Sequence, residues 1–249
     1  MSEEVWFTRL TLKRDAGAVA PLIAVLVPDD GGEAMSTIHR LMWSVMPEAQ
    51  QRRFDRAAPE RQGRAPFLWR EADEGRRYYL LGPQPVENSP YFEIETKPFG
   101  LALSPGDRLA FDLRVHATVD RKVGETPEGG PVRQRIDIAM DALSAEEHLR
   151  PEQKANRAPR RAPAAEGAAR EWLKAQGARD GFRLLAMSLA AYRIERVPRG
   201  RGKPARLGVF DVTGLLEITE PDLFGTRVRG GFGRAKAFGC GLMLLRRSP

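Results

Sequence analysis

The sequence predicts an α+β protein made of two ferredoxin-like (RRM-like) domains in tandem, each with the element order βαββαβ. Two observations lead to this prediction: alternating strand patterns flank a helical pattern near the N-terminus, and the same order recurs after a Ser-Pro-Gly turn. The size is compatible with this prediction, since 249 residues with 42% hydrophobic content can form one large domain or two small ones. No sequence repeat accompanies the second set of elements, so the predicted duplication is one of topology.

The first domain is predicted to span residues 1–103. Apolar side chains alternate along Val5–Lys13, which is the pattern of a strand with one buried face. Asp30 and Glu33 fit a capping box, and helical spacing of apolar residues continues from there to about Pro47. Three further strands are expected, at Pro66–Trp69, Tyr78–Leu81 and Tyr91–Phe99.

The second domain is predicted to span residues 104–249. Its expected elements are a strand at Asp107–Val119, an alanine-rich helix at Ala164–Gln176, a hairpin of Leu184–Val197 and Leu207–Thr219 joined by a basic loop at Pro198–Lys203, a short helix at Pro221–Val228, and a closing strand at Gly241–Leu245. Between Asp120 and Pro163, large apolar side chains are few and charges are many. That composition predicts either a flexible linker or an arginine-rich arm that becomes ordered on RNA.

Composition narrows the class of partner and the compartment. The net charge of +7 favours a polyanion such as a nucleic acid, although an arginine-rich proteome gives the same balance. Cys240 is the single cysteine, which excludes an internal disulfide and a thiolate zinc site. The sequence shows neither a secretory signal nor an apolar run near the roughly 20 residues that span a bilayer. A cytoplasmic protein without a membrane partner is therefore expected.

The segment 230–241 is the strongest functional signal in the sequence. It contains five glycines, two phenylalanines and the cations Arg234 and Lys236. Glycines allow a ligand to approach backbone amides, and exposed N–H groups beside cations form a site for phosphate. Gly231, Gly233, Arg234 and Lys236 are therefore candidate contacts to a phosphodiester backbone. A nucleotide-binding enzyme is a weaker interpretation, because this loop leads into a strand and a dinucleotide fingerprint opens a helix.

His39 is the best candidate for acid–base chemistry among the three histidines. His116 falls in a predicted strand and His148 in the charged segment, and neither has a companion that indicates catalysis. His39 lies on the first helix, with Ser36 one turn before it and Arg40 beside it, so Ser36 and His39 share a face. The alternative is a core position, because methionines and a tryptophan surround His39 in the sequence.

Two blocks of the sequence resemble the CasE endoribonucleases, the repeat-processing subunits of type I-E CRISPR Cascade. The glycine-rich block runs from Gly231 to Leu242, and the second block is His39-Arg40-Leu41-Met42-Trp43. The resemblance implies tandem ferredoxin-like domains, a CRISPR repeat RNA hairpin as substrate, and other Cascade subunits as partners. It also implies that His39 is catalytic. The family often carries tyrosine where this sequence has Ser36, and a serine hydroxyl lacks the reach and acidity of a phenol.

The chemistry that these residues fit is metal-independent RNA cleavage, in which a ribose 2′-hydroxyl attacks the adjacent phosphorus. An imidazole takes or gives the proton, while Arg40, Lys236 or the loop amides stabilise the charged phosphorane. No cofactor and no metal are expected, because the sequence has no clustered carboxylates at metal-binding spacing. Further RNA contacts are expected from Arg157, Arg160 and Arg161. The other class of function left open is a non-catalytic RNA-binding scaffold with the same fold.

Overall fold

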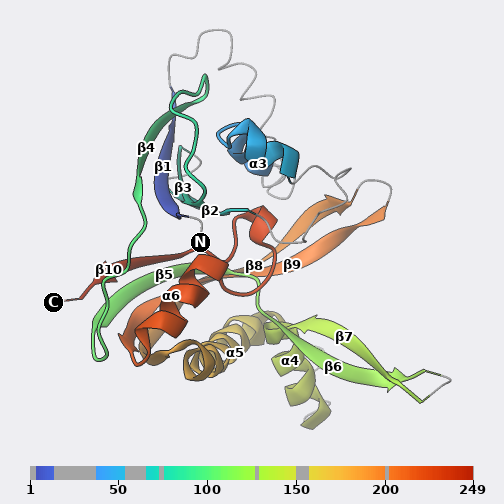
Figure 1. Ribbon diagram of the computed structural model, residues 1–249. Coiled ribbons are helices and arrows are strands. Elements are labelled where there is room, and N and C mark those ends of the chain that lie inside the picture. The colour runs from blue at the N-terminus through green and yellow to red at the C-terminus, as the bar shows by residue number, and fades with distance from the viewer. Residues whose placement is uncertain are drawn as a thin grey trace. The chain divides into compact units, whose positions relative to one another are not determined.

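The structure is a computed structural model, shown in Figure 1. It describes residues 4–13, 38–53, 66–72, 76–126, 129–149, 157–199 and 202–248. The chain divides into two compact units. Unit 1 contains residues 1–102, 195–206 and 225–242, and unit 2 contains residues 103–194, 207–224 and 243–249. The predicted domains at 1–103 and 104–249 stay a prediction, and the glycine-rich segment groups with the N-terminal sheet.

The sheet of unit 1 has four antiparallel strands in the order β2-β3-β1-β4. The strands are β1 (Trp6–Leu12), β2 (Leu68–Ala72), β3 (Arg77–Gly82) and β4 (Phe92–Pro98). The two central strands are the first and third, and the last strand pairs with the first, which is the ferredoxin-like order. The register places Thr8 opposite Leu80 and Thr96, and Leu10 opposite Tyr78 and Ile94.

One face of this sheet forms the core of unit 1 with helical residues from the segment 38–53. Residues 38–43 are helical, and α3 (Glu48–Arg53) follows after a turn. The buried cluster contains Leu10, Ile38, Leu41, Met42, Val45, Met46, Phe67, Trp69, Tyr78, Leu80 and Phe92. The predicted helix up to Pro47 is described only from residue 38 onward, so its capping residues Asp30 and Glu33 lie outside the described residues.

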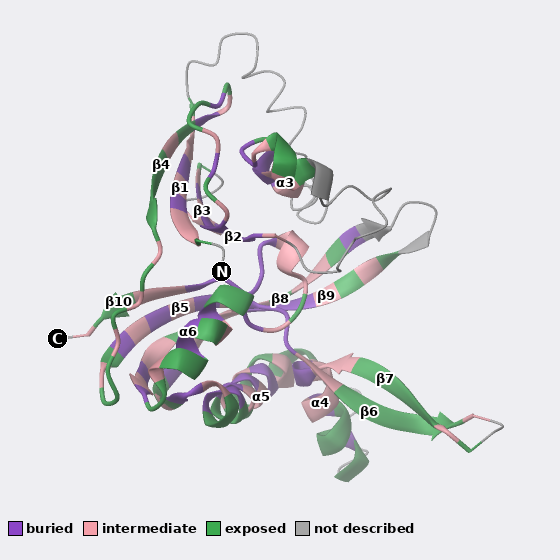
Figure 2. Cartoon of the chain, viewed as in Figure 1, coloured by how far each residue is buried: buried purple, intermediate pink, exposed green. Residues whose placement is uncertain are grey.

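The sheet of unit 2 has the order β10-β5-β9-β8, which is again ferredoxin-like. Its strands are β5 (Arg108–Val115), β8 (Phe182–Arg199), β9 (Gly202–Ile218) and β10 (Met243–Arg247), and its helices are α4 (Ile138–Leu149), α5 (Arg157–Asp180) and the start of α6 (Pro221–Gly230). Burial alternates along β5, where Leu109, Phe111, Leu113 and Val115 are buried (Figure 2). The predicted tandem ferredoxin-like fold is confirmed.

The prediction of one strand over Asp107–Val119 is wrong, because β5 ends before His116 and a separate strand follows. The His116 side chain is buried, and its Nδ1 lies 2.9 Å from the carbonyl oxygen of Gly208. Strand β6 (Thr118–Glu125) then pairs with β7 (Pro131–Asp137) in a separate two-stranded sheet that extends away from α4 and α5 (Figure 1). Side-chain anchoring at His116 therefore redirects the chain within what reads as one continuous pattern.

The prediction of a linker or mobile arm between Asp120 and Pro163 is also wrong for the described residues. This segment contains most of β6, β7, α4 and the first turns of α5. Most residues of the hairpin are exposed, so it lacks the apolar alternation that signals a half-buried strand. Its charged side chains form ion pairs instead of a buried face. Asp120 pairs with Arg135 across the hairpin, and Arg121 pairs with Asp141 of α4. Charged composition here indicates an exposed hairpin.

Two further elements are longer than predicted. Helix α5 begins at Arg157 and ends at Asp180, beyond the predicted Ala164–Gln176 at both ends, and Arg157 in its first turn pairs with Glu147 of α4. Strands β8 and β9 continue through most of the predicted loop Pro198–Lys203. In the described part of the chain, no helix is both long enough and apolar enough to span a bilayer.

Candidate functional site

His39 lies on the helical segment 38–43 with its ring against two aromatic side chains. The ring centroids of His39 and Trp43 are 6.2 Å apart at an interplanar angle of 78°, and those of His39 and Phe67 are 5.7 Å apart at 41°. Trp43 is one helical turn away, so the i, i+4 spacing brings it onto the same face. Phe67 immediately precedes β2 and belongs to the core cluster. His39 is therefore held at the margin of the core.

The hydrogen bond of His39 assigns its neutral tautomer. The indole Nε1–H of Trp43 donates to His39 Nε2 at 3.2 Å, which places the ring proton on Nδ1. Nδ1 is buried, and no described residue gives it a hydrogen-bond partner. Burial lowers the pKa of His39 from 6.5 to about 4, because a low-dielectric environment disfavours the imidazolium. At neutral pH the ring is uncharged and carries its available lone pair on Nε2.

The neighbours predicted for His39 are only partly described. Arg40 is exposed on the same helical segment. Ser36 lies outside the described residues, so its predicted place one turn before His39 stays a prediction.

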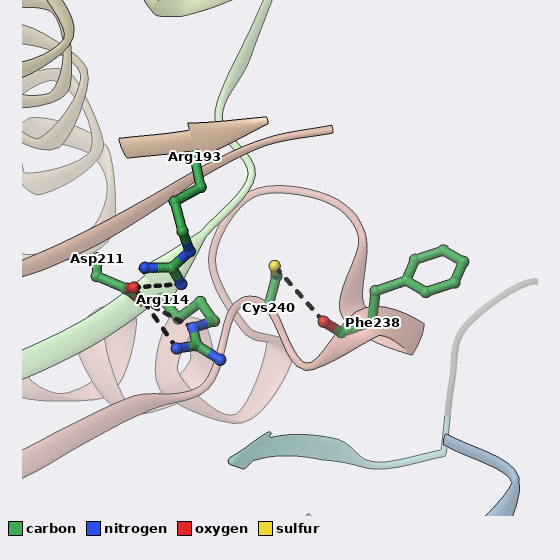
Figure 3. Close-up of polar contacts among 5 residues, drawn as sticks. All are labelled: Arg114, Arg193, Asp211, Phe238 and Cys240. Carbon is green, nitrogen blue, oxygen red and sulfur yellow. Dashed lines mark hydrogen bonds and ion pairs between the residues drawn. The ribbon is translucent and has the colours of Figure 1, made fainter. Parts of the chain in front are cut away.

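The glycine-rich segment forms a closed loop between α6 and β10. The backbone N–H of Phe232 donates to the carbonyl of Gly241 at 2.9 Å, and a short 3₁₀ helix spans Lys236–Phe238. The thiol of Cys240 donates to the carbonyl of Phe238 at 3.8 Å inside the loop (Figure 3). Gly241 has φ +96°, and a Cβ there would lie 2.6 Å from the carbonyl oxygen of Phe232. This closure therefore requires glycine at position 241.

The same loop packs on edge strand β2 of the unit 1 sheet. Trp69 Nε1–H donates to the carbonyl of Ala237 at 3.3 Å. A Cβ on Gly231, which has φ +72°, would lie 2.7 and 2.8 Å from the two methyl carbons of Leu68. The loop thus covers a strand that the sheet order leaves at an edge, and Gly231 permits the close approach.

A cavity of about 820 Å³ lies within unit 1, where the loop faces one end of the sheet. The cations Arg229, Arg234 and Lys236 line it, and Glu4 is the carboxylate among its lining residues. Phe67 also lines the cavity, and its ring centroid is 5.7 Å from that of His39. A cavity of this size, lined by three cations and one carboxylate, suits a phosphodiester.

The predicted site residues separate into two groups. Gly233, Arg234 and Lys236 line the cavity, whereas His39, Arg40 and Gly231 do not, and His39 reaches its wall only through Phe67. The contribution of Phe67 and Arg229 was missed by sequence reasoning, since it depends on which strand end faces the loop. The Trp43 contact was detectable from its i, i+4 spacing to His39.

The predicted arginine cluster belongs to α5, in unit 2. Arg157 Nε donates to Glu147 at 2.5 Å, and Arg160 Nη2 donates to Glu146 at 2.5 Å. Arg161 is half-buried, and its Nε has no hydrogen-bond partner in the described residues. Two of the three predicted RNA contacts therefore already have carboxylate partners.

Other cations of unit 2 are paired in the same way. Asp211 accepts hydrogen bonds from Arg114 Nε at 2.8 Å and from Arg193 Nη2 at 2.7 Å (Figure 3). Burial raises the pKa of Asp211, but the hydrogen bonds and charges of the two arginines outweigh it and lower the pKa below its usual value. Asp211 therefore holds both arginines at neutral pH.

No group of three or more histidine, cysteine or carboxylate side chains that could hold a metal ion occurs among the residues that the structure describes.

The chain belongs to the CRISPR associated protein family, whose sequence model matches residues 5–247. This confirms the resemblance seen in the glycine-rich and histidine blocks. No curated protein matches this chain.

Several solved structures have the same fold and align with nearly the full chain. The CRISPR endoribonuclease Cse3 bound to a 19-nucleotide RNA has 21% identity, covers 98% of this chain and 99% of its own, and gives a TM-score of 0.62. Cas6e from Escherichia coli K-12 has 17% identity, covers 98% and 100%, and gives 0.59. A chain of a CRISPR RNA-guided surveillance complex in a pre-nicking state has 21% identity, covers 98% and 100%, and gives 0.54.

Proposed function

We propose that this protein is a metal-independent endoribonuclease that cleaves the repeat hairpin of CRISPR precursor RNA. The observation that carries the proposal is the cavity lined by Arg234 and Lys236, with Phe67 joining its wall to the His39 ring. Family membership supports the CRISPR context, and the similarity to an RNA-bound Cse3 supports the endoribonuclease activity.

In the proposed reaction, the ribose 2′-hydroxyl attacks the adjacent phosphorus and the 5′-oxygen leaves. The leaving 5′-oxygen takes a proton from water, so the products are a 2′,3′-cyclic phosphate and a 5′-hydroxyl. His39 is neutral at pH 7, which suits a base that accepts the 2′-hydroxyl proton at Nε2. The indole N–H of Trp43 releases Nε2 as the substrate hydroxyl arrives. Lys236 and Arg40 stabilise the phosphorane charge, and Ser36 is at most a hydrogen-bonding partner.

RNA binding is proposed to begin with the phosphates in the cavity. Arg234 and Lys236 supply charge there, and the backbone at Gly233, which lines the cavity, allows close approach. Gly231 was also a predicted contact, but it packs against Leu68 and does not line the cavity. Arg157, Arg160 and Arg161 remain proposed contacts, but Arg157 and Arg160 must exchange carboxylates for phosphates, which reduces the gain from each. The mature RNA is proposed to stay bound as part of Cascade, in keeping with the similarity to a surveillance-complex chain.

The test is single-turnover cleavage of a repeat hairpin in EDTA by wild type, His39→Ala and His148→Ala. His39→Ala should slow cleavage by about 10²-fold or more, the usual contribution of a general acid or base, while hairpin affinity changes by less than about tenfold. His148 is exposed on α4 and serves as the matched control, with cleavage unchanged. Near-normal cleavage by His39→Ala would refute the proposed role.

A second candidate function is a non-catalytic RNA-binding scaffold. It is favoured by Ser36, which stands where the family often has tyrosine, and by the low basicity of the buried His39. The same experiment separates the two functions: a scaffold would bind the hairpin tightly and leave it uncut at every pH.

A further inference from the structure

The sheet of unit 1 has a second face that its core does not use. Cross-strand partners point to the same side of a sheet, so the register defines this face. Phe7 lies opposite Leu81 on β3 and Lys97 on β4, and Arg9 lies opposite Tyr79 and Glu95. The core residues Leu10 and Leu80 point to the other side. Aromatic and charged side chains therefore share the two central strands.

Three aromatic rings gather on this face, and we call Phe7, Tyr79 and Phe99 the aromatic platform. The ring centroids of Phe7 and Tyr79 are 5.5 Å apart with planes inclined by 15°, and those of Phe7 and Phe99 are 6.4 Å apart. All three side chains are half-buried. With Arg9, Glu95, Thr96 and Lys97, the Phe7 and Tyr79 rings line an open hollow of about 340 Å³.

A cross-strand aromatic pair by itself stabilises a sheet and needs no ligand. What points to a ligand is the position of the platform beside the cavity of the proposed active site. Leu81, the register partner of Phe7, lines that cavity, while Phe7 lines the hollow. A strand of RNA that leaves the cavity along this row meets Phe7 first and Tyr79 next.

Lys97 is the charged side chain that could contact a phosphate at the β4 side of this face. Lys97 is exposed and has no ion-pair partner in the described part of the chain. Arg9 pairs with Glu95, but their side chains are 42% and 61% exposed, and such a pair contributes little and opens readily. The other charged residues at these register positions are Arg70 on β2, Arg77 on β3 and Glu93 on β4, so cations outnumber carboxylates over the face as a whole but not on β4 itself.

We propose that the aromatic platform binds the unpaired RNA that flanks the hairpin, with bases stacked on Phe7 and Tyr79 and a phosphate at Lys97. Aromatic rings on the two central strands of a four-stranded sheet provide flat surfaces for unpaired bases, and stacking tolerates any sequence. This inference rests on the proposed function for the identity of the RNA. It adds a site for single-stranded RNA that is separate from the catalytic residues.

The test measures binding of three RNAs, each with a 2′-deoxy nucleotide at the cleavage position so that none is cut. The RNAs are the hairpin alone, the hairpin with an unpaired 5′ tail, and the hairpin with an unpaired 3′ tail. One tail should increase the affinity of the wild-type protein. Phe7→Leu combined with Tyr79→Leu should weaken binding of that RNA by about tenfold, or ~1.4 kcal/mol, and leave the hairpin alone within about twofold.

Two controls keep the result specific. Tyr79→Phe retains the ring and should bind the tailed RNA as wild type does. The unfolding midpoint of the double variant shows whether the sheet is intact, and the leucines preserve its apolar bulk. If neither tail raises affinity, or if the double variant loses the tailed and tailless RNAs equally, the platform does not bind flanking RNA.

Cleavage of an all-ribose hairpin without tails, measured in parallel, reports on the proposed function alone. If this hairpin is not cleaved, the proposed endoribonuclease activity is refuted. The tail-dependent binding would still show whether the aromatic platform binds RNA.

Discussion

The burial of His39 predicts an acid sensitivity of folding that can be assigned to this one side chain. The pKa of His39 falls from 6.5 to about 4 in the folded protein because burial disfavours its charged form. At pH 7.5 neither the folded nor the unfolded state protonates the ring. As the pH falls below 6.5, the unfolded state binds a proton that the folded state does not, so the free energy of unfolding decreases.

The size of the effect follows from the two pKa values. Between pH 7.5 and pH 5, a group with pKa 6.5 unfolded and about 4 folded costs about 2 kcal/mol of stability. The ring keeps some contact with solvent, so this figure is an upper limit and ~1 kcal/mol is the lower expectation. The loss is complete only below the folded pKa.

The measurement is urea unfolding of wild type and His39→Gln at pH 7.5 and pH 5. Glutamine keeps hydrogen-bonding capacity but does not titrate in this range. His116 and His148 are present in both proteins, so their contributions cancel when the pH-dependent losses are subtracted. Wild type should lose ~1–2 kcal/mol more than the variant over this interval. Equal losses would show that the His39 ring is as accessible in the folded protein as in the unfolded chain.

Two further predictions test the glycine-rich loop. Lys236→Ala should weaken hairpin binding and reduce the log–log salt slope by about 0.7–0.9, the value of one phosphate contact, whereas Lys174→Ala, which removes an exposed cation paired with Glu171, should leave the slope unchanged. An unchanged slope for Lys236→Ala would place this cation away from the RNA. Gly231→Ala should lower stability by about 2 kcal/mol or more, because it forces a side chain into φ +72° against Leu68, and thermal unfolding should show a midpoint lower by several degrees. The neighbouring Gly230 has open space at its Cβ, so Gly230→Ala should be close to neutral, and an equally mild Gly231→Ala would contradict the packing argument.

The elements that sequence predicted well carry their own signals. β1 and β5 alternate because one face of each strand is buried, and α6 begins at a proline that suits a first helical turn. The β6–β7 hairpin gave no such signal, since most of its residues are exposed; its strands pair from Thr118 and Asp137 to Glu125 and Pro131, and exposed ion pairs such as Asp120–Arg135 add little. The first turns of α5 depend on Glu146 and Glu147 of the preceding helix, which no local propensity records.

The site was predictable in its parts and not in its assembly. The glycines, Arg234 and Lys236 predict an anion-binding loop from composition alone. His39 is the best catalytic candidate because the other two histidines, His116 and His148, have no neighbours in the sequence that indicate catalysis. The cavity requires Phe67, just before β2, and Leu81, near the end of β3, to lie beside a loop more than 140 residues away, although both look like ordinary core residues in the sequence. Which residues lie beside the loop depends on the register of the sheet, and the hydrophobic periodicity of the sequence does not predict that register.

The glycine-rich loop joins stability and binding through different residues. Gly231 and Gly241 allow the loop to pack closely. A side chain at Gly231 would collide with Leu68, and one at Gly241 with the Phe232 carbonyl. The carbonyl of Ala237 accepts a hydrogen bond from the Trp69 indole N–H, which holds the loop against edge strand β2. Arg234 and Lys236 are left to face the cavity. Because the same twelve residues protect the sheet edge and present the cations, we expect the proposed phosphate site to form only when the N-terminal sheet is folded.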